Sequence, residues 1–200
     1  MAITNYASLA SAVASLLDVN YSDISAIADV LVANAEKRIF REVRDPLMET
    51  AHSTAITSAA ITVPSDYIEM KYAYIDQSVD QQLEMVPMSF LLDRYPPGSD
   101  TGTPLYIARD GSNFKFGPSP DSGYTVSLKY FCRPSAVQTS PSAFFLANTD
   151  LYCYAALLET DTVLGRDNRY PLWESKYAMI RELVNGEAKK SRLSGPLTMR

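Results

Sequence analysis

The stretch PSDYIEMKYAYI, residues 64–75, decides the fold, because it is the strongest strand signal in the chain and begins at a proline break. Three more strand and turn segments follow it: GTPLYIAR at 102–109, NFKFGP at 113–118 and GYTVSLKY at 123–130. Asp110 and Gly111 separate two of them, and this dipeptide is typical of a tight β-hairpin. Weaker signals predict strands at 47–56, 60–63 and 82–86 and a short helix at 87–95. The middle of the chain is therefore predicted to form its own antiparallel β layer.

Helical signals occupy both ends of the chain. Apolar residues recur at three- and four-residue steps over residues 5–17 and 23–44, and Asp45–Pro46 ends the second segment. A third helix is expected over residues 149–164, and a fourth begins near Tyr170 and ends near Asn185–Gly186. The predicted fold class is α+β: a helical bundle from the N- and C-terminal helices with an inserted antiparallel β lobe, either a sandwich or a small barrel. The predicted parts are a bundle of 1–45 and 144–191, a β lobe of 46–143 and an extended tail of 192–200.

The charge is acidic overall and uneven along the chain. The net charge of −5 predicts no basic surface of the kind that binds nucleic acid. Acidic residues outnumber basic ones in the first hundred residues, and the reverse holds in the second hundred. Opposite charges could pair between neighbouring subunits, or the last basic residues could simply favour the dipole at a helix end. The 13 tyrosines favour either strands or partly wet interfaces.

Motifs of enzymes, metal sites and membrane proteins are missing from the sequence. Cys132 and Cys153 are too far apart for a metal motif, and we expect both to be buried thiols of a reducing compartment. The lone histidine, His52, has no nucleophile elbow, phosphate loop or zinc helix to work with. The first residues lack a signal-peptide pattern, and no stretch is long enough to span a bilayer. We expect no catalytic residue, no metal, no cofactor and no membrane association.

The order and spacing of these segments resemble the head-to-tail adaptor proteins of short-tailed bacteriophages, also called connector proteins or tail tubular protein A. The matching segments are PSDYIE at 64–69, GTPLY at 102–106, FKFGPSP at 114–120, GYTVSLKY at 123–130, Arg133–Pro134, DLYCYAAL at 150–157 and WESKY at 173–177. With the N-terminal helix pair, the resemblance spans most of the chain. Its evidence is the order of the segments, since no single motif among them is specific.

The resemblance implies a structural virion protein that is not an enzyme. It implies a homo-oligomeric ring, usually of twelve copies, that is assembled in the host cytoplasm and docks under the portal protein. The ring would join the portal to the tail nozzle or tail fibre protein, and would help line and seal the channel for DNA ejection. DNA would pass without sequence-specific binding, which suits an acidic protein because such a channel should not grip phosphates.

Two sets of residues are candidates for contacts with virion partners. The resemblance implies a C-terminal tail that reaches into the portal, and the candidates there are Lys189, Lys190, Arg192, Leu197 and Arg200. The third helix is apolar on every side, so it must be buried either in the protomer or by a neighbouring subunit. The candidates for a subunit interface are Leu151, Tyr152, Tyr154, Trp173 and Tyr177.

Two other functions stay open at this point. One is a virion-associated peptidoglycan hydrolase, which would use paired carboxylates such as Glu69 and Asp76. The other is a β-sandwich recognition module for a glycan or a protein, in which a fragment near residues 46–134 would bind by itself. A zymogram on peptidoglycan and a binding assay on the fragment would separate these functions from that of an adaptor.

Overall fold

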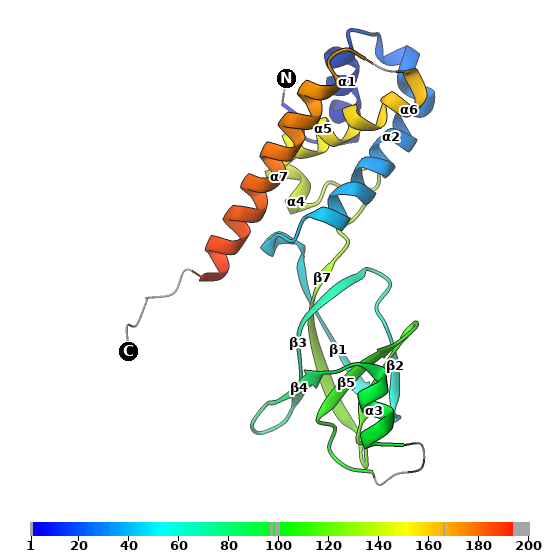
Figure 1. Ribbon diagram of the computed structural model, residues 1–200, viewed down its shortest axis with the longest axis vertical. Coiled ribbons are helices and arrows are strands. Elements are labelled where there is room, and N and C mark those ends of the chain that lie inside the picture. Colours follow the sequence, from blue (N-terminus) through cyan, green and yellow to red (C-terminus); the bar gives the residue numbers. More distant parts are fainter. Residues whose placement is uncertain (1, 97, 99–100, 166, 194–200) are drawn as a thin grey trace. The chain divides into compact units, whose positions relative to one another are not determined.

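The computed structural model describes residues 2–96, 98, 101–165 and 167–193. The chain divides into two compact units, of which one comprises Met1–Met48 and the chain from Pro134 onward, and the other comprises Glu49–Arg133. The first unit is helical, and the second contains every strand of the sheet (Figure 1). The predicted α+β fold, with helices from both chain ends and an inserted β lobe, is confirmed.

The N-terminal helices are α1, Tyr6–Leu17, and α2, Tyr21–Glu42, followed by a 3-10 turn at Pro46–Met48. Asn5 caps α1, because its side chain accepts the Ser8 N–H at 2.9 Å and its own N–H donates to the Ser8 hydroxyl at 3.0 Å. Helix α2 begins two residues before the predicted range of 23–44, and its cap is Asn20. Asp23 accepts the Asn20 N–H at 3.3 Å from inside the first turn.

The C-terminal part of the helical unit contains α4, Ala143–Ala147, α5, Thr149–Glu159, α6, Asp161–Leu164, and α7, Tyr170–Leu193. The predicted helix over 149–164 is broken at Thr160, whose hydroxyl and N–H both donate to the carbonyl of Leu157. Helix α5 contacts every other α-helix of the unit, which explains why it is apolar all round.

Helix α7 continues through Asn185 and Gly186, where its end was predicted. The Asn185 side chain binds the backbone at the end of α2 and just beyond it. Its amide donates to the Glu42 carbonyl at 3.2 Å, and its oxygen accepts the Arg44 N–H at 3.3 Å. The next turn also buries Ala188 at 1% exposure, and this packing outweighs the cost of about 1 kcal/mol for a glycine inside a helix. The tail expected at 192–200 therefore starts within α7, and residues 194–200 lie outside the described part of the chain.

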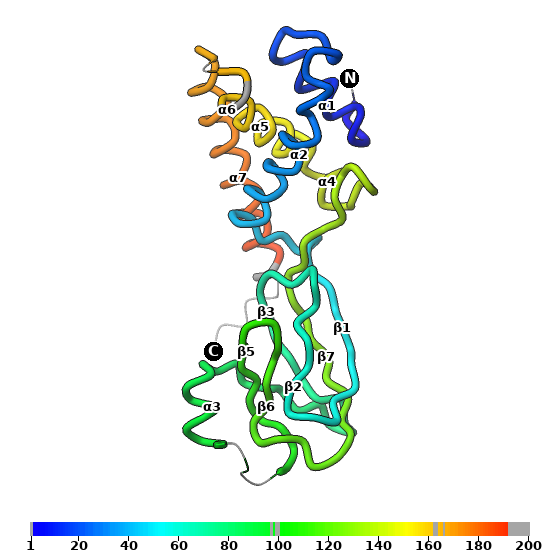
Figure 2. Tube along the Cα trace, turned by 90° about the vertical axis from the view of Figure 1, so that its right-hand side faces the viewer, coloured from blue at the N-terminus to red at the C-terminus, as the bar shows by residue number. Residues whose placement is uncertain are grey.

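The β lobe is one seven-stranded sheet in the order β1-β7-β3-β4-β5-β6-β2. Its strands are β1 Glu49–Ile56, β2 Ala60–Thr62, β3 Tyr67–Asp76, β4 Gln81–Met85, β5 Tyr106–Asp110, β6 Asn113–Gly117 and β7 Tyr124–Cys132. The long strands β1, β7 and β3 lie side by side in antiparallel register (Figure 2). The lobe is not wholly antiparallel, because β4 and β5 pair in parallel across α3, Met88–Arg94. A crossover of this kind returns the chain in its starting direction.

The sheet is barrel-like and nearly closed. Its two edge strands, β1 and β2, are consecutive in the chain and are joined by residues 57–59 alone, which brings the edges together. Buried side chains from β1, β3, β4, β5, β6 and β7 fill one core, in which Ile75, Ile107, Phe114 and Val126 are fully buried. Of the two predicted architectures for the lobe, the small barrel is the one observed.

Candidate functional site

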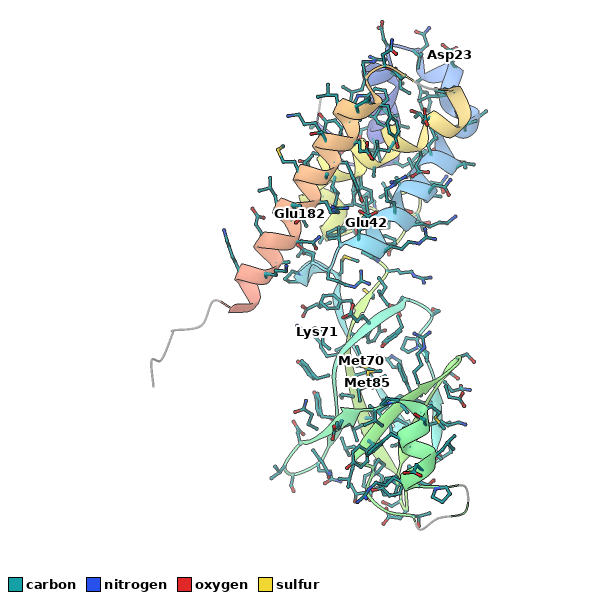
Figure 3. All side chains as sticks on the ribbon, in the orientation of Figure 1. Asp23, Glu42, Met70, Lys71, Met85 and Glu182 are labelled. Carbon is teal, nitrogen blue, oxygen red and sulfur yellow. The ribbon has the colours of Figure 1, made fainter. Side chains whose placement is uncertain are left out.

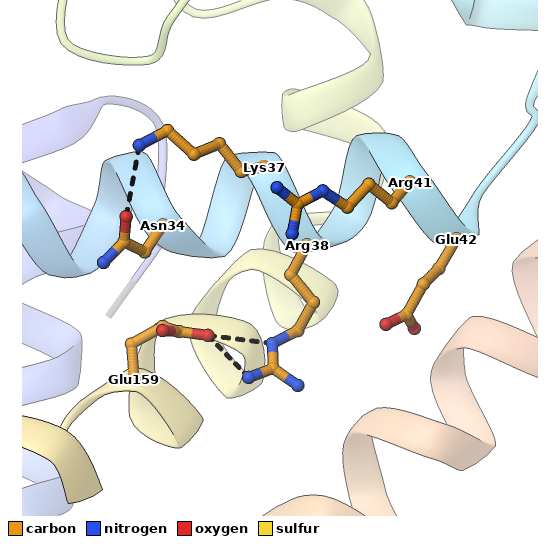
Figure 4. Close-up of a pocket in the computed structure, with 6 residues that line it drawn as sticks. All are labelled: Asn34, Lys37, Arg38, Arg41, Glu42 and Glu159. Atoms are coloured by element: carbon orange, nitrogen blue, oxygen red, sulfur yellow. Dashed lines mark hydrogen bonds and ion pairs between the residues drawn. The ribbon is translucent and has the colours of Figure 1, made fainter.

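A polar groove of about 500 Å³ opens on the helical unit between α2 and α5. Its walls are formed by Asn34, Lys37, Arg38, Arg41, Glu42 and Glu159 (Figure 4). Arg38 links the two helices, because its Nε and Nη2 donate to the same oxygen of Glu159 at 2.9 and 2.6 Å. Burial lowers the Arg38 pKa, but the hydrogen bonds and charge of Glu159 outweigh it and hold the pKa above its usual range.

Glu42 closes the groove at the end of α2, where Figure 3 marks it. Its Oε2 accepts hydrogen bonds from Tyr177 Oη at 3.1 Å and from Arg181 Nη1 at 2.8 Å, so it ties α2 to α7. Burial and the neighbouring charge of Glu42 raise the Tyr177 pKa. Tyr177 therefore stays a neutral hydrogen-bond donor at physiological pH.

Two cations of the groove face solvent. Lys37 Nζ donates to the neutral amide oxygen of Asn34 at 3.3 Å, and Arg41 has no hydrogen-bond or ion-pair partner within the described ranges. Both side chains are exposed, whereas both acids of the groove are already paired with arginines. Such a surface suits contact with an acidic partner better than proton transfer, since its carboxylates are held by ion pairs.

A third carboxylate of α2, Glu36, is enclosed in the protomer. Glu36 is only 7% exposed, and its Oε1 accepts the Val137 N–H at 2.8 Å. Burial raises the Glu36 pKa, and the bond from Val137 opposes that shift. Nearby Tyr152 is fully buried, and its hydroxyl makes no hydrogen bond of normal geometry among the described residues, with only a weak interaction with the Ser142 side chain. Burial and the charge of Glu36 raise the Tyr152 pKa. This pair fixes the segment around Val137 and is closed to ligands.

The residues predicted for a subunit interface are mostly in the core of the protomer. Leu151, Tyr152, Trp173 and Tyr177 are all buried, and Tyr154 is half-buried. Packing inside one copy thus accounts for the apolarity of four of them without a second subunit. A role for these residues in subunit contacts stays a prediction.

The residues predicted to dock the portal lie at the end of α7 and beyond it. Lys189 and Lys190 are exposed on the penultimate turn of α7. Arg192 belongs to the same helix, and its side chain lies outside the described part of the structure, as do Leu197 and Arg200 entirely. The structure thus places two of the five candidates, Lys189 and Lys190, at one exposed helix end. Binding of these residues to the portal stays a prediction.

Helix α7 carries an exposed apolar stripe beside its buried face. Leu172, Met179 and Leu183 are 58%, 50% and 58% exposed. Their spacing of seven and four residues places them on one face of the helix, apart from the buried face that contains Trp173 and Ile180. The sequence of α7 has more apolar positions than one helical stripe can hold, and this excess indicates a second, exposed apolar face.

The β lobe brings together none of the candidate catalytic groups. His52 is exposed on β1, opposite Leu128 of β7. Glu69 and Asp76 lie seven residues apart on β3, and at ~3.3 Å per residue their backbones are about 23 Å apart. Glycosidase carboxylates need a separation of about 5–10 Å, so this pair cannot serve the hydrolase mechanism that was considered.

No group of three His, Cys, Asp or Glu side chains that could hold a metal ion occurs in the described ranges. None of the helices that the structure describes is long and apolar enough to cross a membrane. Cys132 is a half-buried and Cys153 a buried free thiol, and burial raises the pKa of both, with that of Cys153 reaching about 11.

Comparison with known proteins identifies the family. No curated protein matches the chain. The model of the SU10 adaptor protein family matches residues 4–200, which include all the helices and strands described above. The order of helices around an inserted β lobe agrees with the resemblance seen in the sequence. The chain therefore belongs to the SU10 adaptor protein family and is a bacteriophage head-to-tail adaptor.

Proposed function

We propose that copies of this adaptor form a ring that docks under the portal and joins it to the tail nozzle or a tail fibre protein. The observation that carries the proposal is the family match over residues 4–200. Twelve copies are expected per ring. The ring helps line and seal the DNA channel after packaging, and it is assembled in the host cytoplasm before it becomes part of the virion neck.

The surface of the helical unit supports assembly into a larger structure. The unit has its own core around α5. It nevertheless exposes three large apolar side chains along α7, and solvent-exposed apolar stripes of this kind mark surfaces that other proteins cover. A ring also needs two unlike faces on each copy, because its interfaces are heterologous.

The C-terminal end of α7 is proposed as the portal-docking element. Lys189 and Lys190 project from its last turns, and the residues that follow include Leu197 and Arg200. Deletion of residues 194–200 leaves every described helix intact, so it should preserve folding and weaken portal binding. Loss of folding after this deletion would show that the tail belongs to the core instead.

DNA passes through the proposed ring without being read. The net charge of −5 does not favour lasting contacts with phosphates, because tight non-specific binding relies on cationic side chains. Release of DNA during ejection requires that such contacts be weak.

Negative-stain imaging of the purified chain mixed with its portal tests the proposal. We expect a ring of adaptor density added to one end of the portal, with a mass that corresponds to a whole number of copies per portal subunit. A chain that stays monomeric and never joins the portal at any protein concentration or salt would refute it.

A further inference from the structure

The exposed side of α7 combines leucine and methionine with acidic residues. Along residues 172–187 it carries Leu172, Met179 and Leu183, which are each at least half exposed. Glu182 and Glu187 flank the second half of this stripe, and both are exposed. Glu182 is marked on α7 in Figure 3, and its only described ion pair is a 3.2 Å contact with the adjacent Arg181. These five residues are called the α7 face.

The exposed side of α2 is apolar in its first half and positively charged in its second half. Its residues recur at steps of three and four, so they share one face of the helix: Ala26, Val30, Ala33, Lys37 and Arg41. Val30, the largest apolar residue of this set, is 54% exposed. The first half of this α2 face is small and apolar, and its second half is the cationic rim of the polar groove.

We propose that the α7 face of one copy packs lengthwise against the α2 face of the next copy in the ring. The inference rests on the proposed ring and names the surfaces that build it. Each face spans fifteen residue steps, or about 22 Å, so the two are equal in length. In parallel alignment Leu172 and Met179 of α7 lie over the small residues Ala26 and Ala33 of α2, and Leu183 lies beside the alkyl chain of Lys37. Glu182 and Glu187 then lie over Lys37 and Arg41.

The small residues of α2 allow a close approach. Ala26 and Ala33 leave shallow positions on the α2 face into which the long side chains of Leu172 and Met179 can insert, as ridges into grooves. Lys176 is the cation that lies among the apolar residues of the α7 face, and α2 carries Asp29 beside Val30 at the same level. The Asp29 carboxylate accepts a hydrogen bond from the Tyr6 hydroxyl of its own copy and keeps its negative charge for Lys176. Each charge in the contact thus has an opposite charge facing it.

The direction of the helices agrees with a cyclic assembly. Arg169, just before α7, donates to the carbonyls of Leu16 and Leu17, just before α2. At the other end of α2, Glu42 accepts from Arg181 of α7, so the two helices run in the same direction within one copy, as Figures 1 and 2 both show. Rotation about a ring axis along these helices preserves direction, so α7 of one copy meets α2 of the next in parallel.

The two faces cannot meet within one copy. On α2 the buried residues, such as Ala28, Ala35 and Ile39, lie on the side opposite to the α2 face. On α7 the side chains that reach α2, Tyr177 and Arg181, lie on a different side from Leu183. Both faces therefore point away from the core, and pairing between them requires a second copy.

Charge reversal on the full-length chain tests this pairing. The double variant K37E/R41E, assayed with the portal by mass photometry, should lose assembly by about tenfold or more in the concentration required, because like charges then oppose each other. Adding E182K/E187K to the same chain should restore assembly, since the charges are exchanged across the interface. E174K, an exposed change on another side of α7, serves as the control and should assemble like the natural chain.

Mixing two singly blocked chains tests the heterologous geometry. The chain M179D/L183D has an intact α2 face, and K37E/R41E has an intact α7 face, so a mixture should form pairs and stop there. V79D, an equally apolar-to-acid change on the β lobe, should not affect assembly. Circular dichroism of each variant shows that the helices are retained.

The outcomes separate this inference from the proposed function. One outcome is that the natural chain, K37E/R41E and M179D/L183D all join the portal equally well. In that case the pairing of faces is wrong, and the proposed ring is still supported. Failure of the four-residue charge exchange to restore assembly also contradicts the pairing. If the natural chain itself never assembles, both the proposed function and this pairing are refuted.

Discussion

Replacement of Tyr152 by phenylalanine should stabilise the protein. Tyr152 is fully buried, with its ring 5.0 Å from that of Phe145 in an edge-on contact and 6.0 Å from that of Phe144. Tyr152→Phe keeps these ring contacts and removes a hydroxyl that makes no hydrogen bond of normal geometry among the described residues; its interaction with the Ser142 side chain is weak and only opposes the rise of the Tyr152 pKa. A buried polar group without a partner costs about 1–3 kcal/mol, so the free energy of unfolding should rise by about that amount.

Urea denaturation followed by circular dichroism measures this change, at protein concentrations where the chain is monomeric. Tyr177→Phe is the matched control, because the Tyr177 hydroxyl donates to the charged Glu42 and its loss should destabilise by about 1–3 kcal/mol. Opposite signs for the two substitutions are therefore expected. A decrease in stability for Tyr152→Phe, or a change in ring assembly with unchanged monomer stability, would refute the placement of this hydroxyl in the protomer core.

Three further predictions concern stability. Burial raises the Glu36 pKa in the folded state, so ionisation of Glu36 lowers the free energy of unfolding as pH rises through that pKa. E36Q should therefore raise the Tm at neutral pH. This gain should vanish as pH falls to the ordinary pKa of glutamate. Arg169→Ala should lower the Tm because it removes two hydrogen bonds to the last carbonyls of α1, and R169K should recover only part of the loss. G117A should destabilise by about 1–3 kcal/mol, because a Cβ there would lie 2.4 Å from Leu91, whereas G123A, with its nearest atom at 3.9 Å, should change stability by less than about 0.5 kcal/mol in the same thermal scans.

The strands could be predicted from the sequence because their signals are local. Gly111, with positive φ, and Ser112 form the turn between β5 and β6, so the predicted hairpin is present, with Asp110 as the last residue of β5 paired with Asn113. Alternation along residues 124–131 likewise gives β7, which is the strand between β1 and β3. The parallel pairing of β4 with β5 has no local signal, because it depends on how α3 crosses between them.

The helix ends were less predictable because tertiary contacts override local propensity. Asn185 and Gly186 are typical of a helix end, but the Asn185 side chain satisfies backbone groups of α2 instead. The short helix α4 was missed because its five residues are too few for a periodic pattern, although Phe144 and Phe145 anchor it in the core.

The candidate site depends on long-range packing, which limits what a single sequence can show. Arg38 and Glu159 meet across 121 positions of the chain, and no motif connects them. Periodicity alone cannot say which of two adjacent apolar faces of α7 contacts α5, so the sequence does not separate the exposed stripe from the buried face that contains Trp173. The absence of catalytic motifs, by contrast, could be seen directly in the residue types.

A symmetry-resolved cryo-electron microscopy reconstruction of the virion neck addresses the role of this chain most directly. The account predicts a closed ring of the adaptor between portal and tail, in which Leu183 of each copy lies against α2 of its neighbour, near Lys37. A neck without this chain, or copies that touch the portal but leave α7 uncovered by their neighbours, would contradict it.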